Sequence, residues 1–134
     1  MSVSDEFVYI TMGEISGLFD IAKQLYYAND TQFYNTMQNQ ILLLGKEKGF
    51  FVAMNYRVKI CSKDTKSKID VVWRTKDNIF ATFKIDSFFN RSSVESLCSI
   101  SSFFKFWLYY GEPEVPHCKE IVNDFKIHII RKNR

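Results

Sequence analysis

The spacing of apolar residues changes at Gly49, and the change limits the folds that the chain can adopt. Before Gly49, apolar side chains recur every three or four residues, which is the period of an amphipathic α-helix. After Gly49, short runs rich in Val, Ile, Phe and Trp alternate with turn residues, as β-strands do. The chain must therefore pack helical stripes against a sheet, which predicts an α/β fold.

Nine elements follow from these patterns. In chain order they are a helix from Glu14 to Ala28, a helix from Thr31 to Lys48, strands from Phe50 to Val58, from Ile69 to Trp73 (after a basic connection from Lys63 to Lys68) and from Ile79 to Asp86, a helix capped by Asn90 or Ser92 that runs to Ser101, a strand from Phe103 to Tyr110, a helix from His117 to Asp124 and a strand from Lys126 to Ile130. A strand–helix–strand crossover thus follows a meander of three strands. This order predicts a mixed sheet with helices on both faces.

The composition is that of one globular domain. The chain has 134 residues, of which 46% are hydrophobic and 25% are charged. It contains no apolar stretch of the roughly 18 residues that would span a bilayer and no basic leader, so we expect a cytoplasmic protein without a membrane partner. The three cysteines, Cys61, Cys98 and Cys118, lack a CxxC pair, and we expect them to be reduced. His117 and His128 lack the companion ligands of a zinc site.

The net charge of +3 is unevenly distributed. The first 30 residues contain one basic residue and five acids, whereas residues 57–76 contain seven basic residues and two acids. Such a cluster favours contact with the phosphates of nucleic acid, although a solvated loop with scattered lysines has the same composition. The candidate phosphate-binding residues are Lys63, Lys66, Lys68, Arg74 and Arg91, with Lys105 as a further candidate.

An acidic residue interrupts the apolar strand from Ile69 to Trp73. A carboxylate at Asp70 is costly there unless it is paired or binds a cation. On the next strand, Lys84 and Asp86 are two residues apart and share one face, so all three side chains can converge if the strands are neighbours. Two carboxylates and a lysine could bind a divalent cation and orient a water molecule. The alternative is a structural ion pair between Asp70 and Lys84 with a solvated Asp86.

Three segments together resemble a known family. They are the run from Leu42 to Val52, Ile69-Asp70-Val71-Val72-Trp73, and Ala81-Thr82-Phe83-Lys84-Ile85-Asp86. They look like the PD-(D/E)XK, or restriction-endonuclease-like, superfamily, which includes archaeal and viral nucleases and Holliday-junction resolvases. The resemblance covers Thr31 to Tyr110. It implies a single domain in which residues 1–30 form a helical extension, 31–110 a nuclease-like core with a mixed central sheet, and 111–134 a final helix and strand.

The resemblance also implies an activity. The family's first acid falls on Asp70, and its acid-x-lysine motif falls on Lys84-Ile85-Asp86 with the acid and the lysine exchanged. The family's acids hold a magnesium ion and its lysine steadies the attacking water. The resemblance therefore implies hydrolysis of DNA phosphodiesters with Asp70, Lys84 and Asp86 as catalytic residues. Mg²⁺ or Mn²⁺ would be held by Asp70, Asp86 and the helical Glu47, or by Glu95 in its place.

The exchanged motif leaves two alternatives open. Lys84 places an ammonium where the second acid would meet the metal, so the chain could be an inactive nucleic-acid-binding module of the same fold. It could instead be a homodimeric interaction module built on its aromatic strands. Trp73, Trp107, Tyr109 and Tyr110 would stack on bases in the first case, although aromatic residues within strands usually pack the core. The few alanines and many Lys, Asn, Ile and Phe residues suggest an archaeal or viral source.

Overall fold

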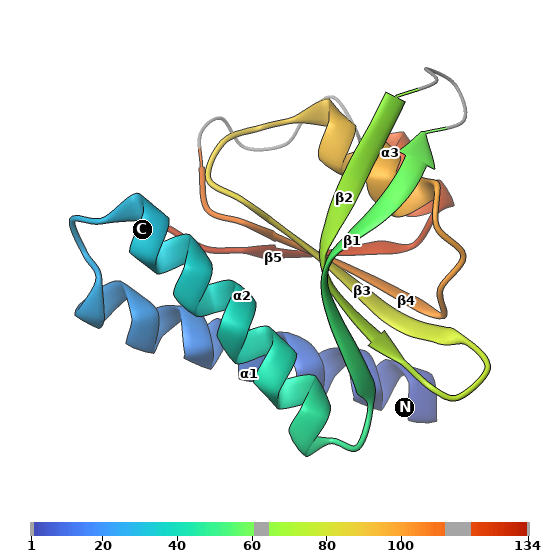
Figure 1. Cartoon of the computed structure of the whole chain (residues 1–134), viewed down its shortest axis with the longest axis horizontal. Helices are drawn as coiled ribbons and strands as arrows, with labels where there is room; N and C mark the ends of the chain where they lie inside the picture. The colour runs from blue at the N-terminus through green and yellow to red at the C-terminus, as the bar shows by residue number, and fades with distance from the viewer. Residues whose placement is uncertain (1, 61–64, 112–118, 134) are drawn as a thin grey trace.

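The computed structural model describes residues 2–60, 65–111 and 119–133, and it contains the nine elements in the predicted order (Figure 1). The predictions for Cys61, Lys63, His117 and Cys118 lie outside the described residues. The elements are α1 (Val3–Leu25), α2 (Asp30–Glu47), β1 (Phe51–Ile60), β2 (Thr65–Arg74), β3 (Ile79–Asp86), α3 (Arg91–Cys98), β4 (Phe104–Tyr109), α4 (Lys119–Asp124) and β5 (Ile127–Arg131).

The strands form one mixed sheet in the order β1-β2-β3-β4-β5. The first three strands are antiparallel neighbours, whereas β3 pairs with β4 and β4 pairs with β5 in parallel. The parallel pairs require crossovers, which α3 and α4 supply. Helices α1 and α2 lie across one side of the sheet, and α3 lies on the other (Figure 1). The predicted α/β class and mixed sheet are confirmed.

Each face of the sheet has its own apolar core. The core on the side of α1 and α2 contains Phe19, Phe33 and Trp73, all fully buried. The core on the side of α3 contains Leu97 and Trp107, also fully buried. The indole Nε1 of Trp73 also donates a hydrogen bond of 3.0 Å to a backbone carbonyl of α2, which fixes the position of the ring. No helix in the described ranges is long and apolar enough to cross a membrane.

Helix α1 begins at Val3, eleven residues before the predicted start at Glu14. The side chain of Ser2 caps this helix by accepting a hydrogen bond from the backbone N–H of Asp5. The polar Thr11 is fully buried at a position where the helical pattern requires an apolar residue, so the pattern before Glu14 was obscured. Because Phe19 further along α1 belongs to the same core as α2, the first 30 residues form part of the core structure.

Strand β2 begins at Thr65, whereas the sequence predicted a basic connection as far as Lys68. The register continues without a shift over this segment, and it places Arg57 opposite Lys68 and Lys59 opposite Lys66. Lysine has a low propensity for β-strands, but the strand propensity of a residue depends strongly on how its neighbours pack. Here Val58 of β1 packs against the core beneath α3 and holds the outer half of the β1–β2 hairpin in place.

Halfway along β1 and β2, the side chains that faced one side of the sheet change to the other side. Val52 packs in the core beneath α2, whereas Tyr56 packs in the core beneath α3, although strict alternation would put both on one face. The same change occurs in β2 between Val71 and Ile69. At the turning point Asn55 has φ +52°, a backbone region that asparagine tolerates better than most residues. The pairing register is unchanged, so both strands turn together.

Candidate functional site

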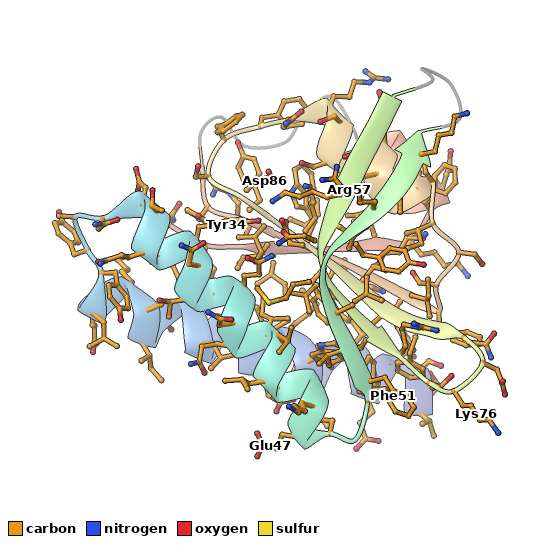
Figure 2. The ribbon with its side chains drawn as sticks, in the orientation of Figure 1. Tyr34, Glu47, Phe51, Arg57, Lys76 and Asp86 are labelled. Atoms are coloured by element: carbon orange, nitrogen blue, oxygen red, sulfur yellow. The ribbon has the colours of Figure 1, made fainter. Side chains whose placement is uncertain are left out.

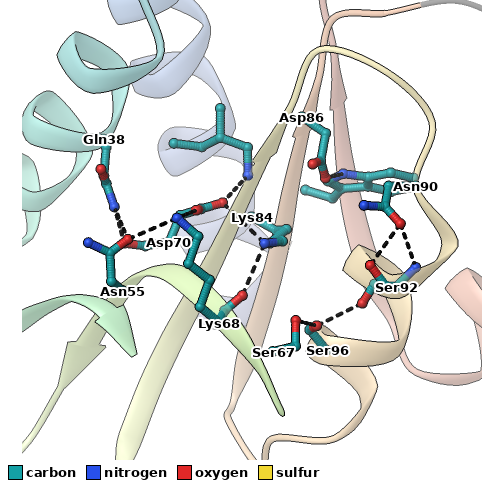
Figure 3. A network of polar contacts seen from close by, with 12 residues as sticks. Gln38, Asn55, Ser67, Lys68, Asp70, Lys84, Asp86, Asn90, Ser92 and Ser96 are labelled. Atoms are coloured by element: carbon teal, nitrogen blue, oxygen red, sulfur yellow. Dashed lines mark hydrogen bonds and ion pairs between the residues drawn. The ribbon is translucent and has the colours of Figure 1, made fainter. Parts of the chain in front are cut away.

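The three residues suggested by the sequence line one open cleft of about 380 Å³. Asp70 comes from β2, and Lys84 and Asp86 come from β3 (Figure 3). The remaining lining residues come from the start of α2, from β2 and β3, and from the loops that follow β3 and β4: Asp30, Thr31, Tyr34, Lys68, Ile85, Ser87, Phe88 and Tyr110. The structure therefore brings Asp70, Lys84 and Asp86 together, with Lys68 beside them.

Asp70 is only 1% exposed, and its carboxylate completes the sheet. Regular pairing between β2 and β3 ends at Val71 and Phe83. Beyond that pair, Asp70 Oδ2 accepts a hydrogen bond of 2.7 Å from the backbone N–H of Ile85. Asp70 Oδ1 accepts a hydrogen bond from the hydroxyl of Tyr34 on α2. The carboxylate thus takes the place of a strand carbonyl and satisfies a buried N–H group.

Two lysines flank this carboxylate. The Nζ atom of Lys84 lies 3.8 Å from Asp70 Oδ2 and donates a hydrogen bond of 3.0 Å to the backbone carbonyl of Lys68. The Nζ atom of Lys68 lies 3.8 Å from Asp70 Oδ1 and donates a hydrogen bond of 3.2 Å to Asn55 Oδ1. The structural ion pair between Asp70 and Lys84 is therefore present (Figure 3).

A glutamine on α2 fixes the position of Asp70 from the other side. Gln38 is buried, and its Nε2 donates hydrogen bonds of 2.9 Å to the backbone carbonyl of Asp70 and to Asn55 Oδ1. These bonds join α2 to the point at which β1 and β2 turn over. The orientation of Asp70 toward α2 is consequently held by both its backbone and its side chain.

Asp86 has a different environment from Asp70. Its Oδ2 accepts a hydrogen bond of 2.8 Å from the indole Nε1 of Trp107. Burial raises the pKa of the Asp86 carboxyl above its usual range, because removal from water disfavours the charged form. Hydrogen bonding from Ser93 and Trp107 and the nearby ammonium of Lys84 lower the pKa, but they oppose this shift only in part.

Two tyrosines complete the polar surroundings of the acids. Burial raises the pKa of Tyr110 to about 12, and the nearby charges of Asp86 and Asp70 add to the shift. Burial and the charge of Asp70 also raise the pKa of Tyr34. Both hydroxyls are therefore protonated at neutral pH, which allows Tyr34 to donate its hydrogen bond to Asp70.

The two helical acids proposed as metal ligands lie elsewhere. Glu47 is at the C-terminal end of α2, about 20 Å along the helix axis from Tyr34 (Figure 2). Glu95 on α3 forms an ion pair of 3.5 Å with Arg91. Neither acid lines the cleft. The helical pattern alone cannot tell which end of α2 reaches the sheet edge, and this explains the misplacement of Glu47.

Several candidate phosphate contacts also lie outside the cleft. Arg74 is exposed at the far end of β2, roughly 13 Å along the strand from Asp70. Lys105 is buried, and its ammonium donates hydrogen bonds to the carbonyls of Leu97 and Ile100 at the end of α3. Burial lowers the pKa of Lys105. Its role is to cap α3, so the prediction that it contacts phosphate is wrong.

The aromatic residues predicted as possible stacking platforms are core residues. Trp73, Trp107 and Tyr109 are fully buried, and Tyr110 is 8% exposed. Phe88, which no sequence pattern singled out, is 61% exposed on the rim of the cleft. The available signal was its position directly after β3, where an aromatic residue has no strand partner to pack on.

Comparisons with protein-family models, with curated proteins and with solved structures found no match to this chain. Within the described ranges, no group of three or more His, Cys, Asp or Glu side chains is arranged to hold a metal ion.

Proposed function

We propose that this protein binds nucleic acid, with DNA as the expected partner, through the outer half of the β1–β2 hairpin. The observation that carries the proposal is a basic ladder, defined as Arg57, Lys59, Lys66 and Lys68. The register sets Arg57 directly opposite Lys68 and Lys59 directly opposite Lys66. Like charges at facing positions destabilise an antiparallel pair. Phosphate groups along the ladder would offset the repulsion between the facing cations.

Arg57 and Lys59 of the ladder lie on the face of the hairpin that points away from α3. Tyr56 and Val58 alternate with the basic residues of β1 and pack toward the core beneath α3. Arg57 and Lys59 are exposed. Lys68 continues the ladder into the cleft, where its ammonium reaches Asp70. The proposed binding surface therefore runs from the hairpin to the mouth of the cleft.

The proposal describes binding without hydrolysis, in a restriction-endonuclease-like fold whose metal site has been replaced by an ion pair. Two ammonium groups 3.8 Å from the Asp70 oxygens repel any divalent cation that approaches the carboxylate. Such repulsion amounts to ~4 kcal/mol per pair of unit charges at 4 Å and an effective dielectric near 20. The donors from Tyr34 and Ile85 occupy further acceptor positions that a metal would need.

Neutralising the ladder is expected to weaken binding and to reduce its dependence on salt. The double variant Arg57→Gln/Lys59→Gln removes two phosphate contacts, so the slope of log K against log salt should fall by roughly 1 to 2. Fluorescence anisotropy with a labelled oligonucleotide, at salt concentrations from about 50 to 300 mM, measures the change in this slope.

The matched control is Lys46→Gln/Lys76→Gln, which removes the same charge from exposed positions outside the ladder. Lys76 lies at the opposite end of the sheet from Arg57 (Figure 2). We expect this control to bind like the parent. Equal loss in both double variants would mean that net charge alone drives binding, and unchanged binding in the ladder variant would overturn the proposal.

Metal-dependent hydrolysis of phosphodiesters is the second candidate function. The observation in its favour is that Asp70, Lys84 and Asp86 line the same cleft. Incubation with supercoiled, linear, single-stranded and branched DNA in Mg²⁺ or Mn²⁺ tests it. We expect no cleavage; nicking by the parent that disappears in Asp86→Asn would establish the nuclease and overturn the non-catalytic proposal.

The variant Lys84→Glu is expected to create a metal site that the parent lacks. It exchanges an ammonium beside Asp70 for a carboxylate, which turns repulsion of a divalent cation into attraction. Titration calorimetry should detect Mn²⁺ binding by Lys84→Glu, and Mn²⁺ should raise its melting temperature. The control Lys84→Gln removes the ammonium without adding an acid. Equal Mn²⁺ binding by the parent would show that the ion pair does not exclude metal.

A further inference from the structure

We propose that the cleft receives an unpaired nucleobase, so that the protein recognises single-stranded rather than duplex nucleic acid. This inference builds on the proposed function, because the basic ladder would hold the backbone of the strand whose base enters the cleft. Lys68 belongs to both surfaces, and it connects the ladder with Asp70.

The charge of the cleft disfavours phosphate and favours a neutral ligand that donates hydrogen bonds. Three acids, Asp30, Asp70 and Asp86, line it together with two basic residues, Lys68 and Lys84. The two lysines are already engaged with the Asp70 carboxylate. The volume of about 380 Å³ lies within the range of small-molecule pockets and is far too small for a duplex. A nucleobase is neutral, flat and able to donate hydrogen bonds.

The rim of the cleft offers a surface for stacking. Phe88 is 61% exposed there, and aromatic faces stack with every type of base. Tyr34 cannot offer its ring in the same way, because the ammonium of Lys68 lies 5.6 Å from the centre of that ring. Tyr110 is 8% exposed and forms part of the cleft wall. Phe88 is accordingly the stacking residue of the proposed site.

Asp86 is placed to read the edge of the stacked base. The Trp107 indole fixes one oxygen of its carboxylate with a hydrogen bond of 2.8 Å. A carboxylate has about four acceptor positions, so capacity remains for donors from a ligand in addition to Trp107 and Ser93. Guanine presents two adjacent donors, N1–H and the N2 amino group, on the edge that pairs in a duplex. Only an unpaired guanine can offer both donors to Asp86, so a preference for guanine would also be a preference for single-stranded over duplex nucleic acid.

The experiment measures anisotropy of three labelled probes: a thymine 12-mer with one central guanine, the all-thymine 12-mer, and the duplex of the first probe. We expect the guanine probe to bind most tightly and the duplex to bind at least about 10-fold more weakly. Phe88→Ala should weaken binding of the single strand about 10-fold. The control Phe103→Ala changes a phenylalanine that is 66% exposed outside the cleft, and it should bind like the parent.

Asp86→Asn supplies the test of base reading. It keeps an acceptor for Trp107 but replaces the second oxygen by an amide donor, so the preference for guanine over thymine should disappear while salt dependence remains. Duplex binding as tight as single-strand binding, or a Phe88→Ala variant that binds like the parent, would overturn this inference and leave the basic ladder intact. Absence of binding to all three probes would overturn the proposed function as well.

Discussion

Replacing Asp70 by alanine is expected to lower the free energy of unfolding by about 3–5 kcal/mol, the usual cost of removing one partner of a buried ion pair. The carboxylate is 1% exposed and accepts hydrogen bonds from Tyr34 and from the backbone N–H of Ile85. Alanine leaves that N–H group buried without an acceptor. It also leaves the ammonium of Lys84 without its counter-charge. Urea unfolding followed by tryptophan fluorescence measures the loss.

Asp70→Asn is the matched comparison, because the amide oxygen can still accept a hydrogen bond while the charge is lost. We expect it to lose clearly less stability than Asp70→Ala. Asp86→Asn should not destabilise the protein at pH 7, since burial raises the pKa of Asp86 and so makes its charged form unfavourable. A loss of less than ~1 kcal/mol for Asp70→Ala would contradict a structural role for the carboxylate.

A loss of stability in Asp70→Ala would also lower any binding or cleavage activity. Loss of nucleic-acid binding or cleavage in Asp70→Ala would follow from loss of structure alone, because the carboxylate completes the sheet between β2 and β3. Asp86 is the better residue for testing chemistry, since an asparagine at this position can still accept the hydrogen bond from Trp107. The tests of hydrolysis and base reading therefore use Asp86→Asn.

Replacing Gly45 by alanine is expected to cost about 3 kcal/mol of stability, which is at the upper end of overpacking effects. A Cβ atom at Gly45 would overlap the indole ring of Trp73. That ring is fully buried, its Nε1 donates to the carbonyl of Ile41, and it stacks on Phe50 with ring centres 5.5 Å apart. The indole therefore cannot move away without breaking these contacts, and α2 must shift instead.

Gly17→Ala is the control for the change from glycine to alanine. Gly17 also lies within a helix, but a Cβ atom there would meet no atom within 4 Å. Alanine should raise the stability by about 0.5–1 kcal/mol, because glycine is the poorer helix former. Thermal and urea unfolding of both variants separate the two effects. A Gly45→Ala protein as stable as the parent would contradict the close packing of α2 on Trp73.

Much of the fold could be predicted from local patterns. Strand β3 has the predicted bounds, and Asn90, one of two predicted caps, does cap α3 by accepting a hydrogen bond from the N–H of Ser92. The predicted boundaries of α1 and β2 were wrong because polar or basic residues interrupted the apolar pattern there. Thr11 interrupted the apolar stripe of α1, and the lysines of β2 concealed a strand.

The candidate site could be predicted only in part. Asp70 was identified because a carboxylate in an apolar strand must have a partner, and Lys84 was correctly proposed as that partner. The hydrogen-bond donor Tyr34 was not identified, because it lies 36 residues earlier and reaches Asp70 only after α2 packs on the sheet. The same packing places Glu47 at the other end of α2, away from the cleft.

The sequence by itself determined the class of the fold, the order of the elements and the one acid that needed a partner, because these depend on periodicity and on the cost of burying charge. Only the tertiary structure decided where that acid points. Asn55 adopts a positive φ, β1 and β2 turn over together, and Asp70 faces α2 against the alternation of its strand. Alternation is a local rule, whereas this turn depends on contacts between residues far apart in the chain.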